Sequence, residues 1–477
     1  MMSFECRNTT GSRRIWQGLA MLYCEQSMEE HTMKNKALAH VVAVNMGYGH
    51  ERAAFALRHL APGGQVTVAN DYPGIPDHER RLWETGKSFY ECVSRFKNVP
   101  VLGSATFGLM DKMQRIPDFY PRRDLSKPSL QVRQTYALIR RQGMCHDLIK
   151  RFKERPLPIV STFFTPAFAA EELDYPEDIY VVLCDADIAR AWVPLNPKKS
   201  RIKYLAPTGR VVERLKLYGV KEKNITLTGF PLPYESVGGA HSPEYVRADL
   251  RRRMCNLDPN GNFVAKAHNL LDATFGEALR AKKPGTPSIT FAVGGAGTQR
   301  ELVALALRSL ADSIRQGRIV VNLVAGTRPE VAEYFEREIR LCGLVSAKRA
   351  GRVTVLFEDD RSKYFSAFTK LMRKTDVLWT KPSELSFYTG LAIPMIMAPT
   401  VGSQEDFNRA WLTYVGGGAD GLAPQYMNEW LFDWIHSGAL ARMAWNGFTN
   451  APTHGAYRIE SLLRGDSTVW RQLPIVV

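Results

Sequence analysis

Three segments of the chain combine glycines or carboxylates with residue types that could act on a ligand. The first is Asn45-Met-Gly47-Tyr-Gly49-His50. Glycine lets a backbone approach a ligand closely, and the N-terminus of a following helix favours negative charge. We expect His50 to serve as a general base or ligand donor in a cleft, and a helix-capping histidine is the alternative. Arg52 departs from the Gly-x-Gly-x-x-Gly pattern of dinucleotide sites.

The second segment is Gly294-Gly295-Ala-Gly297-Thr298. Glycines ahead of a helix can present a cradle of backbone N–H groups to a phosphate. A plain tight turn is the alternative.

The third segment carries the most polar groups. It runs Thr380-Lys381-Pro382-Ser383-Glu384, continues through Gly390 to Pro394, and ends in Ser403-Gln404-Glu405-Asp-Phe-Asn408. We expect Pro382 to begin a helix, with Ser383 and Glu384 at its positive end, and Gln404 and Glu405 to begin another helix at the same cleft. Carboxylates and amides together suit sugar and ribose hydroxyls. The alternative for Glu384 is a charge that merely favours the helix dipole.

Short β-branched runs alternate with helical stretches from Ala37 onward, which is typical of parallel α/β architecture. The first predicted strands are 40–45, 65–69, 159–161, 179–183, 203–207 and 224–228, with helices at 52–60 and 209–218. A second series has strands at 288–293, 319–324, 353–357, 377–379 and 395–397, with helices at 302–316 and 330–342. Two such halves imply a cleft, with ligands outside the carboxyl ends of the strands.

These patterns divide the chain into five parts. Residues 1–37 are predicted to be an N-terminal extension, disordered and not a signal peptide, with Met33 as a candidate start. Residues 38–235 form the first α/β domain and 286–440 the second. Between them, 236–285 form a linker with helices, and 441–477 form a C-terminal helical tail.

From residue 38 to about residue 440 the sequence resembles the two-domain glycosyltransferases of the GT-B fold. It is most similar to the monogalactosyldiacylglycerol synthase and processive diacylglycerol glucosyltransferase group, and more distantly to the N-acetylglucosaminyltransferase of lipid II assembly. The matching motifs are Gly47 to His50, Cys184-Asp185 with Trp192-Val-Pro194, Lys203 to Pro231, Gly294 to Gly297, Ala325-Gly326-Thr-Arg328, Thr380-Lys381 and Ser403 to Asn408.

Three positions depart from the family pattern. Asn45 stands where the family's first turn opens with an acidic residue, and Tyr48 interrupts the first glycine run. Phe387 falls where the donor-binding glutamate is expected. Glu384 lies three residues earlier, on the same helical face.

The resemblance implies two Rossmann-like, doubly wound parallel-sheet domains that face a cleft. The first domain would bind an acceptor and the second a UDP-sugar, with no cofactor besides this co-substrate and no metal. Transfer of a hexosyl group would proceed by inverting displacement, with a base that takes the proton of the acceptor hydroxyl. His50 is the first candidate for that base and Asp185 the second.

The resemblance also implies the groups that bind the donor. The leaving diphosphate would meet backbone N–H groups near Gly294, Gly295 and Ser383, and the side chains of Arg328 and Lys381. The nucleobase would stack near Phe357 and Glu358. Ribose and sugar hydroxyls would be held by Glu384, Gln404, Glu405 and Asn408.

Composition excludes several classes of protein. The 477 residues contain 63 Lys and Arg against 48 Asp and Glu, and the net charge is +15. No apolar run reaches the ~18 residues of a spanning helix. The seven cysteines form no Cys-x-x-Cys pair and the ten histidines no His-Glu-x-x-His pattern, which fits neither a disulfide framework nor a metal site and favours a cytoplasmic location.

Positive charge gathers in residues 111–155, where twelve Lys and Arg accompany five Asp and Glu. Phe119, Tyr120 and Tyr136 are interleaved with these charges. Such a stretch suits an anionic membrane surface on the inner face, where a lipid acceptor would lie, and a solvated helical face is the alternative.

Three other functions remain to be weighed. A nucleotide-sugar epimerase on the same fold would act on the donor alone. A non-catalytic sugar-nucleotide-binding protein is suggested by Asn45 and Phe387. A nucleic-acid partner is not expected, because the basic residues are dispersed and no recognised module is present.

Overall fold

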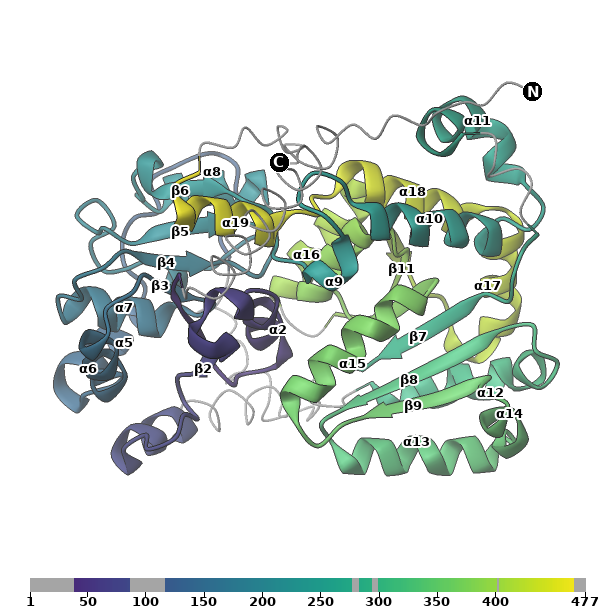
Figure 1. Cartoon of the computed structure of the whole chain (residues 1–477), viewed down its shortest axis with the longest axis horizontal. Coiled ribbons are helices and arrows are strands. Elements are labelled where there is room, and N and C mark those ends of the chain that lie inside the picture. Colours follow the sequence, from purple (N-terminus) through teal and green to yellow (C-terminus); the bar gives the residue numbers. More distant parts are fainter. Residues whose placement is uncertain (1–37, 86–115, 277–282, 294–298, 401–402, 467–477) are drawn as a thin grey trace, which may run out of the picture.

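Two parallel six-stranded sheets form the frame of the molecule, one in each half of the chain (Figure 1). The structure is a computed structural model that describes residues 38–85, 116–276, 283–293, 299–400 and 403–466. The first sheet has the strand order β2-β1-β3-β4-β5-β6. Its strands are β1 His40–Ala43, β2 Thr67–Val68, β3 Ile159–Ser161, β4 Ile179–Val182, β5 Lys203–Ala206 and β6 Ile225–Leu227.

The second sheet has the order β12-β11-β10-β7-β8-β9. Its strands are β7 Ser288–Ala292, β8 Val320–Gly326, β9 Val353–Phe357, β10 Val377–Thr380, β11 Met395–Met397 and β12 Gly418–Asp420. The central strands β1, β3, β4, β7, β10 and β11 are buried along their whole length. Continuous burial of apolar residues is expected where helices cover both faces of a parallel sheet.

Helices follow the strands in both halves. In the first half they are α2 Tyr48–Ala56, α5 Leu130–Gln142, α6 His146–Glu154, α7 Phe164–Glu172 and α8 Gly209–Leu217. The connecting region holds α9 Tyr234–Val237, α10 Glu244–Leu257 and α11 Asn262–Phe275. The second half holds α12 Arg300–Arg315, α13 Pro329–Leu341, α14 Val345–Arg349, α15 Arg361–Lys374, the 3₁₀ helix η6 Glu384–Leu391, α16 Ser403–Val415, α17 Met427–His436 and α18 Ala439–Asn450.

The strand orders place a point of topological reversal in each sheet. In the first sheet the chain moves outward from β1 to β2 and then returns to β3 on the other side. In the second it moves from β7 through β8 to β9 and returns to β10 beside β7. Crevices at such reversals are where open α/β sheets bind ligands. The predicted fold class, two doubly wound parallel sheets facing a cleft, is confirmed.

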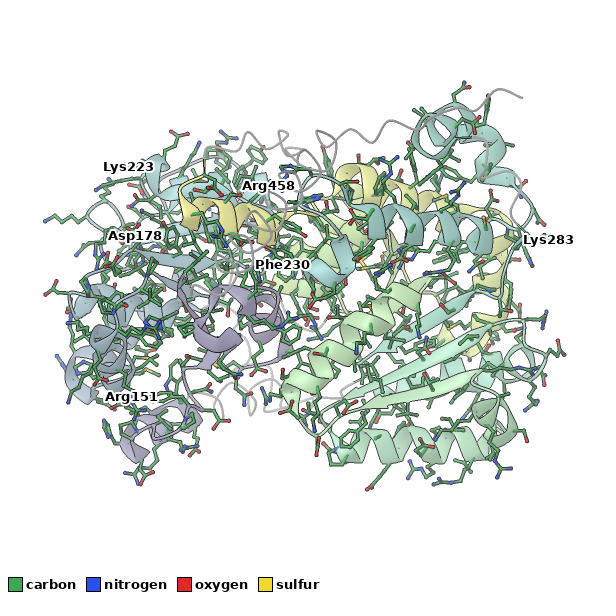
Figure 2. The ribbon with its side chains drawn as sticks, viewed as in Figure 1. Arg151, Asp178, Lys223, Phe230, Lys283 and Arg458 are labelled. Carbon is green, nitrogen blue, oxygen red and sulfur yellow. The ribbon has the colours of Figure 1, made fainter. Side chains whose placement is uncertain are left out.

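The last described helix, α19 Gly455–Arg464, returns to the first half (Figure 1). Its residues Ala456 and Ile459 are buried against the first sheet, in the same apolar cluster as Val41 and Leu205. Arg458 donates to the carbonyl oxygen of Thr228 at 3.0 Å. Figure 2 shows Arg458 and Phe230 close to the centre of the molecule, where the two halves meet.

The helix starts predicted at Arg52 and at Pro382 are wrong. The helix predicted from Arg52 begins at Tyr48, because Gly47 adopts a φ of 110° and turns the chain directly from β1 into α2. The helix predicted from Pro382 is the 3₁₀ helix η6, which begins at Glu384 because Ser383 before it is extended. Strands β3, β9 and β11 have the predicted limits.

Candidate active site

A pocket of about 180 Å³ lies between the two halves, at the carboxyl ends of both sheets. The first half contributes the turn after β1 and the residues after β4. The second contributes the residues after β7 and β10 and one residue of α15. The lining consists of Met46, Gly47, Tyr48, Gly49, His50, Arg52, Cys184, Asp185, Ala292, Val293, Tyr364, Thr380, Lys381, Ser383, Glu384 and Leu385.

His50 lies on the first turn of α2, with its ring against two aromatic side chains. The ring centroid is 5.1 Å from that of Phe163 and 5.6 Å from that of Trp192. Burial lowers the pKa of His50 to about 4, although the carboxylate of Glu384 and the backbone of Thr162 both oppose this shift. The imidazole is therefore neutral at neutral pH, and its Nδ1 has no hydrogen-bond partner in the described part of the chain.

Asp185 follows β4 and is held from the opposite half by Asn408. The amide Nδ2 of Asn408 donates to Asp185 Oδ1 at 2.9 Å, while its Oδ1 accepts from the backbone N–H of Ala186 at 2.7 Å. Burial raises the pKa of Asp185 to about 6, with smaller raising effects from Glu384 and Glu405, while Asn408 and Lys381 act against it. This carboxyl group therefore titrates close to neutral pH, where a general base is most useful.

Two cationic side chains line the pocket, and each is paired with a carboxylate. Arg52 of α2 forms an ion pair with Glu384 of η6, so this pair joins the two halves. Lys381 pairs with Glu405 on α16 within the second half. The described lining is therefore close to electrically balanced.

Tyr48 ties the glycine turn to the second half. Its hydroxyl accepts from the backbone N–H of Thr327 at 2.9 Å and lies 3.0 Å from the Thr327 Oγ1. Gly326 leaves room for this ring, because a Cβ there would lie 2.5 Å from the Tyr48 hydroxyl. Tyr48, which stands between Gly47 and Gly49, thus makes a contact between the halves.

The structure brings together seven of the residues predicted from sequence. The pocket lining contains Gly47, Gly49, His50, Asp185, Lys381, Ser383 and Glu384. Glu405 and Asn408 lie behind it, where they contact Lys381 and Asp185 rather than line the cavity.

Four other predicted residues lie outside the lining. Arg328 precedes α13, is 38% exposed and pairs with Glu330. Phe357 is the last residue of β9, and Glu358 follows it. Gln404 is on the first turn of α16 and is partly buried. Gly294 and Gly295 fall outside the described residues.

Sequence reasoning missed Arg52 and Tyr364 as parts of the site. Arg52 is 4% exposed, and its Nη2 donates to the Tyr364 hydroxyl at 3.2 Å. The composition of residues 52–56 could have indicated the role of Arg52. Arg52 begins an otherwise apolar run through Ala56 on a predicted buried helix. A lone arginine in such a run needs a buried partner.

Neither a metal centre nor a membrane span is found in the described ranges. No group of three or more His, Cys, Asp or Glu side chains among these residues is arranged to hold a metal ion. Every helix in the same ranges is too short or too polar to cross a bilayer.

One family model matches the chain, described as "Domain of unknown function (DUF6938)", over residues 268–421. This range covers the second sheet and about a third of the sequence. No curated protein matches the sequence.

Several solved structures are similar in fold. MurG from Acinetobacter baumannii is 13% identical with a TM-score of 0.42, over 90% of this chain and 99% of that one. UDP-GlcNAc 2-epimerase from Neisseria meningitidis, bound to UDP-GlcNAc, is 12% identical with a TM-score of 0.42, over 69% and 81%. UDP-GlcNAc 2-epimerase from Methanocaldococcus jannaschii is 14% identical with a TM-score of 0.38, over 76% and 89%. All three TM-scores lie below 0.5.

Proposed function

We propose that the protein transfers a hexosyl group from a UDP-sugar to an acceptor hydroxyl by metal-independent inverting displacement. The observation that carries this proposal is the pocket at the reversal points of both sheets, where two proton acceptors of one half face polar groups of the other. The proposal assigns residues 38–235 to the acceptor and 286–440 to the donor. Residues 236–285 then form a linker and 441–477 a C-terminal tail.

Asp185 is the better placed of the two proposed bases. In the transfer step a bond forms between the acceptor oxygen and the anomeric carbon, the bond from that carbon to the diphosphate breaks, and the hydroxyl proton passes to the base. A carboxylate with a pKa of about 6 takes this proton more readily at neutral pH than an imidazole with a pKa of about 4. His50 would then orient the hydroxyl.

The diphosphate would be stabilised by groups at the second sheet. Lys381 and the backbone N–H of Ser383 and Glu384 lie at the lining and are the proposed donors. Arg328 has no part in this proposal, because it lies outside the lining and pairs with Glu330.

A lipid acceptor remains the proposed acceptor class, in line with the monogalactosyldiacylglycerol synthase resemblance. Tyr120 is 63% exposed and Leu130 is 57% exposed, and Arg122 and Arg123 lie between them in sequence. Exposed apolar and basic side chains together support peripheral binding to an anionic inner membrane surface. Some basic side chains of the segment 111–155 form ion pairs with carboxylates, as Arg140 does with Glu172.

An epimerase acting on the same donor is the second candidate. The halves are already joined beside the pocket by the Tyr48–Thr327 and Arg52–Glu384 contacts, and the cavity is small. A closed site with two proton acceptors of different pKa also suits a rearrangement of the sugar, which takes a proton from one carbon and returns it.

Calorimetric titration of the full chain with UDP, GDP, TDP and ADP tests the donor site. We expect selective binding of UDP, weakened about tenfold or more by Lys381→Met, because this substitution removes a cation from the lining. Arg328→Ala is the matched control and should leave binding within about twofold. Absence of nucleotide binding by the unmodified protein contradicts the proposal.

Incubation with UDP-sugars then separates the two reactions. Product formed from the donor alone would favour the epimerase, and release of UDP that depends on an added lipid acceptor would favour the transferase. Binding without either reaction would identify a sugar-nucleotide-binding protein.

A further inference from the structure

The side chain of Glu384, which belongs to the second half, contacts the first half. One oxygen of its carboxylate, Oε1, is bound there by Arg52. Glu384 is the first residue of η6, and its Oε1 accepts from Nη1 of Arg52 on α2. Its Oε2 lies beside Gly49, where a Cβ would be only 2.9 Å away. Among the described residues, the hydrogen bond from Arg52 is made to Oε1, and none is made to Oε2.

Arg52 is itself fixed by its surroundings. Its guanidinium lies 4.7 Å from the ring centroid of Phe368 and 5.7 Å from that of Phe365, and Nη2 donates to Tyr364. Burial alone would lower the pKa of Arg52, but Tyr364 and Glu384 outweigh that effect and raise it. The charge is thus permanent, and the aromatic rings leave the side chain little freedom.

We propose that Arg52 is a positioning residue for Glu384. By binding Oε1 it directs Oε2, beside the pocket-lining Gly49, to accept a hydrogen bond from a hydroxyl of the bound nucleotide sugar. This inference rests on the proposed function and adds the residue that sets the geometry of donor recognition. It also makes the recognition site dependent on both halves, because the glutamate belongs to one and its support to the other.

The chemistry favours arginine at this position. A carboxylate that is mostly buried is costly unless a cation compensates it, and removal of one partner leaves the other charge uncompensated. Lysine would supply the charge, but its compact ammonium cannot bind the carboxylate and the Tyr364 hydroxyl with the fixed fork of a guanidinium.

A second ion pair between the same elements provides the control. Glu51 of α2 pairs with Arg361 at the start of α15, and neither residue belongs to the pocket lining. Arg361→Met therefore removes a cation that joins α2 to the second half and leaves Glu384 and Arg52 in place.

The test measures the Kd for a UDP-sugar by calorimetry on full-length variants. We expect Arg52→Met to raise the Kd about tenfold or more and Arg52→Lys to raise it about threefold to tenfold, while Arg361→Met changes it less than twofold. Glu384→Gln should add little loss in the Arg52→Met background, because both changes remove the same interaction. Thermal unfolding checks that each variant folds. Arg52→Lys and Glu384→Gln carry the test if Arg52→Met does not fold.

Three results would overturn the inference. Equal losses in Arg52→Met and Arg361→Met would show that the pair only holds the halves together. Unchanged binding in Arg52→Lys and Arg52→Met, with normal binding by the unmodified protein, would show that Glu384 needs no support. Fully additive losses would show independent roles. An unmodified protein that binds no UDP-sugar refutes the proposed function itself, which separates the two failures.

Discussion

Burial of Asp185 raises the pKa of this proposed catalytic base and lowers the stability of the fold. Its pKa of about 6 lies above the ordinary value of 3.8, so the folded chain binds this proton more tightly than the unfolded chain does. The ionised form therefore destabilises the fold as pH rises above about 4, and the effect is complete above about 6. Residues that destabilise a fold in this way are typical of functional sites.

We predict that Asp185→Asn raises the free energy of unfolding at pH 8 while it abolishes turnover. Each pH unit between the ordinary and the raised pKa corresponds to about 1.4 kcal/mol, so the gain is at most about 3 kcal/mol. The asparagine Oδ1 can still accept from Asn408. Urea unfolding at pH 4 and pH 8 measures the effect, which should be small at pH 4.

The pH dependence of kcat/KM completes this test. The unmodified protein should lose activity as pH falls through about 6, because the proposed base becomes protonated. His50→Gln should retain this limb if Asp185 is the base. A gain in stability that is equal at both pH values, or a limb that disappears in His50→Gln, would contradict this assignment.

At the scale of elements, the turn from β1 into α2 is matched to the end of β8. Gly326 has a φ of 70°, and a Cβ on it would contact the Tyr48 hydroxyl. Two independent features thus require glycine there, one in the backbone and one in the packing between halves.

We predict that Gly326→Ala lowers the free energy of unfolding by about 1–3 kcal/mol and weakens UDP-sugar binding, because Tyr48 must leave its position beside the pocket. Gly351→Ala is a matched control, since Gly351 has a φ of 71° with open space around its Cα. It should show the backbone effect on stability without the effect on binding. The Kd for a UDP-sugar is measured by calorimetry. Equal Kd values for the two variants would show that Tyr48 has no part in binding the UDP-sugar.

The limits of several short apolar strands could be predicted from the sequence. Strands β3, β9 and β11 have the predicted limits, and the residues just after strands β4 and β10, Asp185 and Lys381, reach the pocket as the strand-end rule predicts. Arg328 after β8 lies outside the described lining, and β8 is one strand farther from the reversal point than β7. A strand that directly follows another in the chain can therefore end farther from the pocket.

Contacts between the halves could not be predicted. Asn408 lies 223 positions from Asp185 and Arg52 lies 332 positions from Glu384. Periodicity and spacing describe neighbours along one helix or strand, so they carry no information on such pairs. The family resemblance placed Asn408 at a ligand, and the structure places its amide against the Asp185 loop.

At the scale of the whole molecule, the two halves share apolar packing. Phe230, at the end of the first half, stacks on Phe387 of η6 with ring centroids 4.9 Å apart and an angle of 11° between planes (Figure 2 labels Phe230). Both side chains are buried in one cluster that also contains Phe55 and Ala186 of the first half and the core of the second.

We predict that thermal unfolding, followed by calorimetry, shows a single transition, because the apolar cluster of the second half extends into the first half through Phe55, Ala186 and Phe230. Phe387→Ala should lower the free energy of unfolding by about 3–5 kcal/mol, as is usual for a buried phenylalanine. Phe387→Leu, which keeps most of the apolar volume, should cost less. Two separate transitions in the unmodified protein would show that the halves unfold independently.

The return of α19 to the first half means that the chain crosses between the halves twice, and both crossings pass through one place. Gly229 on the outward crossing lies against Pro452 on the return, and Gly455 follows directly against the backbone of Phe230. Because these two connections are adjacent, we expect any relative motion of the halves to be a rotation centred on this place. Such a rotation would change the width of the pocket while the same residues of its two walls stay opposite one another.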